Sequence, residues 1–133
     1  MKKIVIRFNA PVILTFALLS LLALLLGNWT NGATTYQYFS VYRASLSDPL
    51  TYVRFFGHVL GHADYEHYMS NMLLILLVGP GLEEKYGSGT MVWIIALTAL
   101  ITGLVHFLFF PNTVLLGASG VVFMMIVLSS FTA

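Results

Sequence analysis

The chain has 133 residues, of which 59% are hydrophobic and only 8% are charged, and its formal net charge at pH 7 is +1. So few charges do not suit a small soluble domain, and the composition predicts an integral membrane protein. The small net charge argues against nucleic-acid binding. Without cysteine these residues form no disulfide and no thiolate metal site, which leaves the four histidines as the strongest candidate metal ligands.

The first predicted element is an apolar helix over about residues 10–27, near the roughly 20 residues that a membrane-spanning helix needs. Basic residues precede it and the small residues Gly32 and Ala33 follow it, which is also the pattern of a secretory signal. Because the apolar run exceeds the roughly 7–15 residues of a signal core, we favour a retained helix.

A connection over about residues 28–61 comes next and is too apolar for a solvated loop. Aromatic side chains, which prefer the headgroup region of a bilayer, recur along it: Trp29, Tyr36, Tyr38, Phe39, Tyr42, Tyr52, Phe55 and Phe56. We expect a structured loop that lies partly in the outer interface, with Ser47-Asp48-Pro49 as a helix start and Arg54 held by polar neighbours. A simple aromatic belt explains the same composition equally well.

Three further apolar spans follow, over about residues 67–82, 91–110 and 114–133. Together with the first span they predict an all-α fold, a polytopic membrane helical bundle with four transmembrane helices, the last of them truncated. The sequence is still apolar at Ala133, with no charged flank. We therefore expect one membrane domain over residues 1–133 that is incomplete at its C-terminus.

Basic residues set the expected orientation. They precede the first span and follow the second, and the positive-inside rule places them on the cytoplasmic side: Lys2, Lys3, Arg7 and Lys85. The second and fourth helices then begin at the outer face. His67, Asn71 and Ser119 therefore share one depth near the outer surface, where costly polar side chains mark a functional site.

The serine lies in the sequence Gly117-Ala118-Ser119-Gly120. Flanking glycines let another backbone approach closely and leave the hydroxyl uncrowded, and free N–H groups at a helix start stabilise a developing oxyanion. The same small residues also let membrane helices pack tightly. Taken alone, the motif favours a packing site over a nucleophile.

His67 and Asn71 are four residues apart, so a helix places both side chains on one face, where they can donate hydrogen bonds to one oxyanion. Two other interpretations stay open. One is a structural hydrogen-bond cluster between helices, and the other is a metal site in which His58, His62 and Glu66 line one helix face. Three ligands spread over roughly 12 Å of helix cannot all bind one ion, so we predict no metal and no cofactor.

Taken together and in this order, these residues resemble the rhomboid intramembrane serine proteases. The resemblance runs from the loop to near the end of the chain, through four segments: Arg54-Phe55-Phe56, residues 58–71, residues 82–88, and Gly117-Ala118-Ser119-Gly120. It implies that Ser119 is the nucleophile and that His67, Asn71 and the Ser119 backbone N–H form the oxyanion hole. It also implies supporting roles for five further residues: His62, Arg54, Glu83, Gly117 and Gly120.

Two features depart from the pattern of the family. Val53 stands where the family usually carries a tryptophan before the loop arginine. The general base of the family is a histidine on the sixth helix, so we expect the base beyond the chain end and these residues alone to be inactive. His106 is embedded in the third span and is expected to be a packing residue. If it were the base, His106→Ala would abolish labelling by a serine-directed probe.

The resemblance implies an intramembrane serine endopeptidase, without a cofactor, that cleaves transmembrane helices near the outer face of a prokaryotic plasma membrane. The expected partners are transmembrane protein substrates and the lipid bilayer. One alternative is a rhomboid-like pseudoprotease that binds transmembrane helices without cleaving them. Another is a fragment of an unrelated transporter or channel, for which the sequence offers neither paired Gly/Pro interruptions nor a carboxylate deep within a span.

Overall fold

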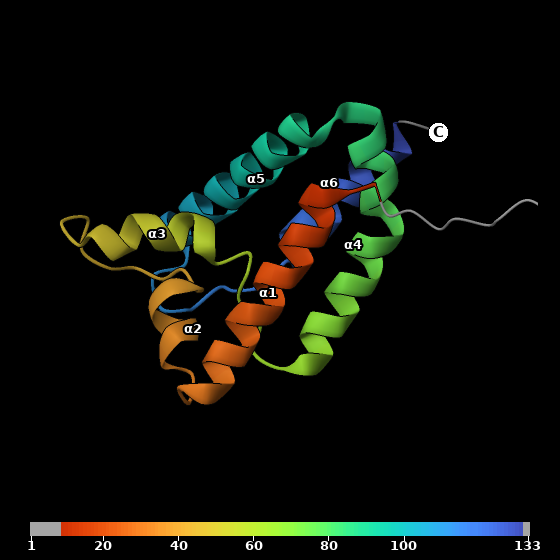
Figure 1. The fold of residues 1–133 in the computed structure, drawn as a ribbon. Coiled ribbons are helices and arrows are strands. Elements are labelled where there is room, and N and C mark those ends of the chain that lie inside the picture. Colours follow the sequence, from red (N-terminus) through yellow and green to blue (C-terminus); the bar gives the residue numbers. More distant parts are fainter. Residues whose placement is uncertain (1–8, 132–133) are drawn as a thin grey trace, which may run out of the picture.

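The computed structural model describes residues 9–131, and this part of the chain is built from six helices (Figure 1). They are α1 (Pro11–Trp29), α2 (Ala33–Tyr38), α3 (Pro49–Gly57), α4 (Tyr65–Tyr86), α5 (Ser88–Phe109) and α6 (Ser119–Ser130). The predicted all-α fold is confirmed. The basic residues Lys2, Lys3 and Arg7, which carry much of the expected orientation, lie outside the described residues.

The predicted spans correspond to α1, α4, α5 and α6, with one change of boundary. Of the described helices, α1 and α5 are long and apolar enough to cross a membrane. The sequence predicts the fourth span from Val114, but α6 begins only at Ser119. The preceding residues are extended because Leu115 pairs with Val41: the Val41 N–H donates to the Leu115 carbonyl at 2.8 Å, and the Leu115 N–H to the Val41 carbonyl at 3.0 Å.

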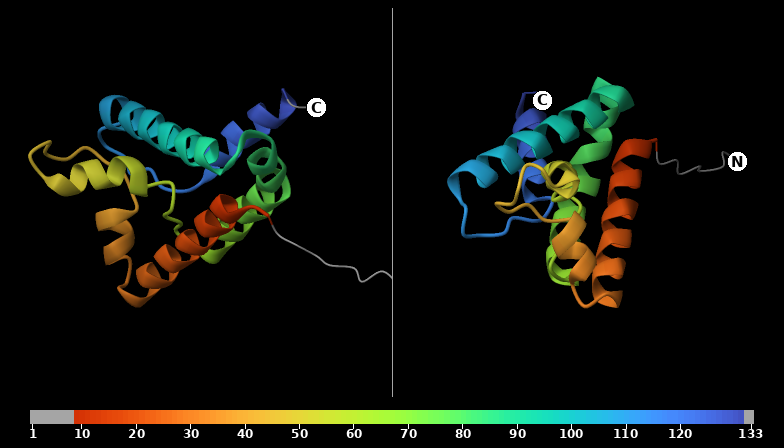
Figure 2. Two further views of the ribbon diagram at one scale, coloured as in Figure 1. Left: turned by 45° about the horizontal axis from the view of Figure 1, so that its top comes forward. Right: turned by 90° about the vertical axis from the view of Figure 1, so that its left-hand side faces the viewer.

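The connection between α1 and α4 is a structured loop that contains α2 and α3. Helix α3 begins where the sequence predicts, with Pro49 in its first turn and the Asp48 carboxylate accepting the Leu50 N–H at 2.9 Å. In Figures 1 and 2, α1 and α5 begin near each other and then diverge, and α2 and α3 lie across the open side between them.

The main core lies where α4 packs between α1 and α6. Its largest fully buried side chains include Ile13 of α1, Ile75 of α4 and Met125 of α6. Gly79 of α4 permits the close approach of α1, because a Cβ at that position would lie only 2.7 Å from the Ile13 side chain. Close contact of this kind holds membrane helices together by van der Waals packing, since lipid offers no hydrophobic driving force between them.

A buried carboxylate joins the beginnings of α1 and α5 to the end of α4. Glu83 is 3% exposed. One of its oxygens accepts the Ile13 N–H at 2.9 Å, and the other accepts the Val12 N–H at 3.1 Å and the Ser88 hydroxyl at 2.7 Å. The first N–H groups of a helix lack partners within the helix, and Ala10, which precedes α1, has no side chain that could cap them. Glu83 supplies that cap from another helix.

We expect Glu83→Gln to lower the thermal stability of the protein. The glutamine NH₂ would face N–H donors, and the loss of a buried acceptor costs about 1–3 kcal/mol, more where the acceptor is charged. Unfolding would be followed by circular dichroism in detergent micelles. Glu84→Gln, at the exposed neighbouring position, is the matched control and should leave the midpoint near that of the wild type. Equal shifts in the two variants would contradict the capping role.

Candidate active site

Ser119 is the first residue of α6, and its side chain is exposed. The first backbone bond of the helix runs from the Val122 N–H to the Ala118 carbonyl at 2.9 Å. Within the described residues, the N–H groups of Ser119, Gly120 and Val121 therefore have no hydrogen-bond acceptor. An exposed hydroxyl and free N–H groups thus share one helix start, where the helix dipole favours negative charge.

The turn before Ser119 is held in place by the segment that follows α3. Gly117 adopts a φ of 119°, which only glycine reaches without strain. Its N–H donates to the His58 carbonyl at 2.8 Å, and the next N–H, of Ala118, donates to His62 Nε2 at 3.3 Å. Consecutive N–H groups of the serine turn are therefore bound by His58 and His62, so the position of α6 depends on this segment.

His62 is a buried acceptor at the centre of the site, with a 2% exposed side chain. Because a backbone N–H can only donate, Nε2 must be unprotonated, and the hydrogen-bond network assigns the proton of the neutral ring to Nδ1. Nε2 also contacts the Asn71 amide nitrogen at 3.0 Å. The imidazole therefore joins α4 to the serine turn. This contact is how His62 would act as a supporting residue.

Asn71 lies beside the serine turn, as the sequence predicts. It is half-buried on α4, and its Nδ2 would lie 3.9 Å from a Cβ added to Gly117. One amide hydrogen is directed to His62, and the second leaves Asn71 a further donor. The structure therefore brings together the amide of Asn71, the imidazole of His62 and the backbone that carries Ser119.

His67 lies one turn before Asn71 on α4, but its side chain is 71% exposed and is bound to Asp64. His67 Nδ1 is 2.8 Å from Asp64 Oδ1, and the same oxygen accepts the His67 backbone N–H at 2.9 Å. Asp64 is thus the N-cap of α4 as well as the partner of the imidazole. Nδ1–H donates this hydrogen bond to the carboxylate, so Nε2 of the neutral ring is an acceptor.

Two other predicted supporting residues, Arg54 and Gly120, hold elements in place. Arg54 is 5% exposed; its Nε donates to the Gln37 carbonyl at 2.8 Å and its guanidinium lies over the Tyr42 ring at 4.6 Å. Its expected polar neighbours are therefore present. Gly120 faces α5, where a Cβ would lie 3.6 Å from the Thr102 methyl group, so this glycine serves helix packing.

The metal site left open by the sequence requires His58, His62 and Glu66 on one helix. Residues 58–64 instead form the connection between α3 and α4, and only Glu66 is helical. His58 Nε2 is bound to the Ala99 carbonyl at 2.8 Å, and His62 Nε2 to the serine turn. Among residues 9–131, no group of three or more histidine, aspartate or glutamate side chains is placed to hold a metal ion.

His106 is bound to the connection that follows α5. Its Nε2 is 3.0 Å from the Thr113 carbonyl and 3.2 Å from the Thr113 hydroxyl, and its ring stacks on Phe110. These contacts give His106 a structural role at the end of α5. Each of the four histidines thus has a hydrogen-bond partner other than Ser119.

A cavity of about 520 Å³ adjoins the site on the side of α2. His62 lines it together with Ala63, Val114 and Leu116, and the rest of its wall comes from α1, α2 and the turn between them. Asn28, Asn31 and Thr35 contribute polar groups there. Because such a cavity offers hydrogen bonds, it can admit water to within reach of the serine turn.

Sequence reasoning did not predict the roles that two residues play in shaping the site. Asp64 caps α4 and binds His67, and His58 holds the Gly117 N–H through its backbone carbonyl. An aspartate immediately before an apolar helix is a recognised start signal, so Asp64 carried a usable signal. The contact of His58 is made by backbone and left no signal in the sequence.

Comparison with known protein families gives one match: a family model described as Rhomboid domain covers residues 49–133. This range is more than half of the chain and includes α3 to α6, with every residue of the candidate site. Comparison with curated proteins gives no match.

We expect the stability of the protein to fall as the pH drops below about 6.5, the ordinary pKa of histidine. Burial lowers the pKa of His62, and likewise that of His58, so the folded state resists protons that the unfolded state accepts. The stabilisation is complete above the unfolded pKa and is lost as pH falls toward the folded one. His62→Gln keeps an acceptor for the Ala118 N–H but cannot be protonated. Its unfolding midpoint, measured from pH 7.5 to 5, should therefore depend less on pH. An unchanged dependence in this variant would refute the assignment to His62.

Proposed function

The chain belongs to the rhomboid family, and we propose that it is an intramembrane serine endopeptidase that cleaves transmembrane helices near the outer membrane face. The observation that carries the proposal is the hydrogen-bonded group of His62, Asn71 and the Ala118 N–H at the start of α6. It holds an amide donor and free backbone N–H groups beside an exposed serine hydroxyl. Acyl transfer requires these groups together.

The proposed reaction begins with attack by Ser119 Oγ on the carbonyl carbon of a substrate peptide bond. The new C–O bond forms as the hydroxyl proton passes to a histidine base, and the carbonyl oxygen becomes an oxyanion. The Ser119 N–H and the Asn71 amide then donate to that oxygen. Collapse of this intermediate breaks the C–N bond, the base returns its proton to the leaving amine, and water later hydrolyses the acyl-enzyme.

His67 joins this oxyanion hole through Nε2 when its ring is protonated. Its Nδ1 proton is committed to Asp64, so the neutral ring presents a lone pair at Nε2, and only the imidazolium presents a donor. The Asp64 carboxylate is suited to hold that positive charge. His67 is exposed, which leaves the ring free to turn toward the bound substrate.

The general base is assigned by family resemblance to a histidine outside these residues. His106 does not serve this role in the proposal, because Thr113 and Phe110 hold its ring at the end of α5.

Ser119 Oγ has no hydrogen-bond partner within residues 9–131, which also suits the second candidate function: a rhomboid-like pseudoprotease that binds transmembrane helices without cleavage. Retention of His67, Asn71 and Ser119 together favours the enzyme.

Replacement of the nucleophile separates the two functions. We expect the protein produced from its complete gene to cleave single-span membrane reporters and to react with a fluorophosphonate probe. Ser119→Ala should abolish both. Ser70→Ala is the matched control, because this exposed hydroxyl of α4 donates only to the Glu66 carbonyl, and it should retain both. Binding of the reporters without cleavage, equal in wild type and Ser119→Ala, would establish the pseudoprotease instead.

Replacement of Asn71 tests the oxyanion hole. Removing one such donor typically lowers turnover about 100–1,000-fold, and because the amide acts on the transition state, Asn71→Ala should change kcat far more than KM. Asn112→Ala, in the exposed turn after α5, is the control and should leave both constants unchanged. Initial rates on a detergent-solubilised reporter would supply the two constants. A change confined to KM would contradict the role of the amide.

A further inference from the structure

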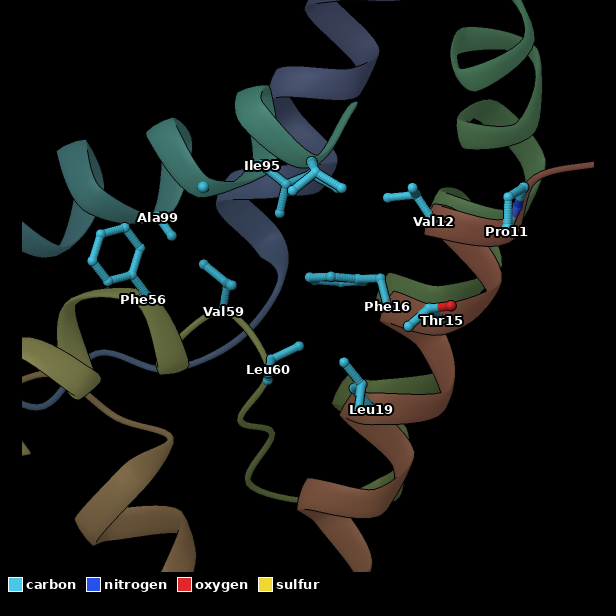
Figure 3. A pocket seen from close by; sticks show the side chains of 12 residues that line it. Pro11, Val12, Thr15, Phe16, Leu19, Phe56, Val59, Leu60, Ile95 and Ala99 are labelled. Carbon is cyan, nitrogen blue, oxygen red and sulfur yellow. The ribbon is translucent and has the colours of Figure 1, made fainter. Parts of the chain in front are cut away.

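An apolar hollow of about 400 Å³ lies between α1 and α5 (Figure 3). Phe16 and Leu19 of α1, Ile95 of α5, and Val59 and Leu60 after α3 point into it. The floor is buried, with Phe16 6% and Ile95 8% exposed, whereas the rim residue Leu19 is 47% exposed. The hollow is therefore an open groove in the surface and not an enclosed void.

The groove lies at hydrocarbon depth in a single leaflet. Its walls come from α1 and α5, the two helices suited to cross a membrane. Glu83 binds the beginnings of both helices, so Pro11 and Ser88 mark one end of the molecule. The lining residues lie within about 17 Å of that end at 1.5 Å per residue, which is close to half of a hydrocarbon core of about 30 Å.

The chemistry of the lining excludes water as the occupant. A retained water needs roughly two to four hydrogen-bond partners, and Thr15 carries the only side-chain hydroxyl among the lining residues. An empty groove would forfeit the dispersion contacts of its walls. A single hydrocarbon chain satisfies both the size and the apolar character.

We propose that this groove binds one acyl chain of a membrane lipid in the leaflet at the α1 start. The chain would lie between Phe16 and Ile95, beneath Val59 and Leu60, and would fill the space that opens as α1 and α5 diverge. With the N-terminus in the cytoplasm, this is the inner leaflet, whereas Ser119 lies toward the outer one. The lipid site is thus separate from the proposed catalytic site and does not depend on it.

Photo-cross-linking tests the proposal. The protein is reconstituted in dioleoylphosphatidylcholine vesicles that contain a small fraction of phosphatidylcholine with a diazirine on one acyl chain, and labelled residues are mapped by mass spectrometry. We expect labelling of α5 to concentrate on Val92, Ile95 and Ala96, which line the groove. Trp93 and Leu97, which are exposed on other sides of α5, should be labelled several-fold less.

Two neighbouring leucines provide a matched pair of variants. Leu19→Trp fills the groove and should lower labelling of α5 several-fold, whereas Leu18→Trp, which is also exposed on α1 but lies outside the groove, should leave it unchanged. Ala96→Phe fills the groove from α5 and serves if the first variant does not fold, as judged by its circular dichroism.

Three outcomes would overturn the proposal. Equal labelling around α5, or an equal effect of both tryptophan variants, would indicate ordinary contact with surrounding lipid. An unlabelled groove would mean that another part of the protein occupies it, and a cross-linked pair of chains would assign it to a second copy. None of these readouts uses proteolysis, so failure here and failure of the proposed function are distinguishable.

Discussion

The fold depends on the requirement that polar groups at membrane depth find partners within the protein, because hydrocarbon offers none. Glu83 meets this requirement for the start of α1, where no side chain of α1 itself caps the helix. His58 Nε2 meets the Ala99 carbonyl on α5, and the Tyr68 hydroxyl donates to the Ala17 carbonyl on α1. Each of these contacts joins two elements, so polar pairing sets the positions of the helices.

The same requirement is relaxed at the candidate active site. The N–H groups at the start of α6 have no acceptor within the described residues, and the Ser119 hydroxyl is exposed. Elsewhere a membrane helix start of this kind would be costly. Here a neighbouring cavity with polar walls can supply water. A transition-state oxyanion would occupy the free donors, so the cost of leaving them unpaired becomes a gain during the reaction.

The sequence predicted those features that local chemistry determines. Asp48 and Pro49 mark the start of α3, and spacing alone places His67 and Asn71 on one helix. The sequence alone could not predict contacts between segments that are far apart in the chain. The pairing of Leu115 with Val41 delays the start of α6, and the backbone carbonyl of His58 holds Gly117. Both contacts are hydrogen bonds between backbone groups, so neither composition nor hydrophobic periodicity could predict them.

The sequence also could not predict which way a side chain turns, even on a helix that it predicted correctly. His67 and Asn71 share a face of α4 by spacing, yet His67 turns out toward Asp64 and Asn71 turns inward to His62. The difference arises because His67 lies in the first turn of α4, where the capping carboxylate competes for its ring. Asn71 is one turn deeper on α4, where its amide meets His62 Nε2 at 3.0 Å.

A continuous set of contacts links the apolar groove to the serine turn. Phe16 and Ala17 are neighbours on α1, the first in the apolar groove and the second bound to the Tyr68 hydroxyl. The Tyr68 ring lies edge-on to His62, with 5.6 Å between the ring centres, and His62 holds the serine turn. A displacement of α1 would therefore act on His62 through one rigid aromatic side chain. The proposed acyl chain would pack against this same segment of α1.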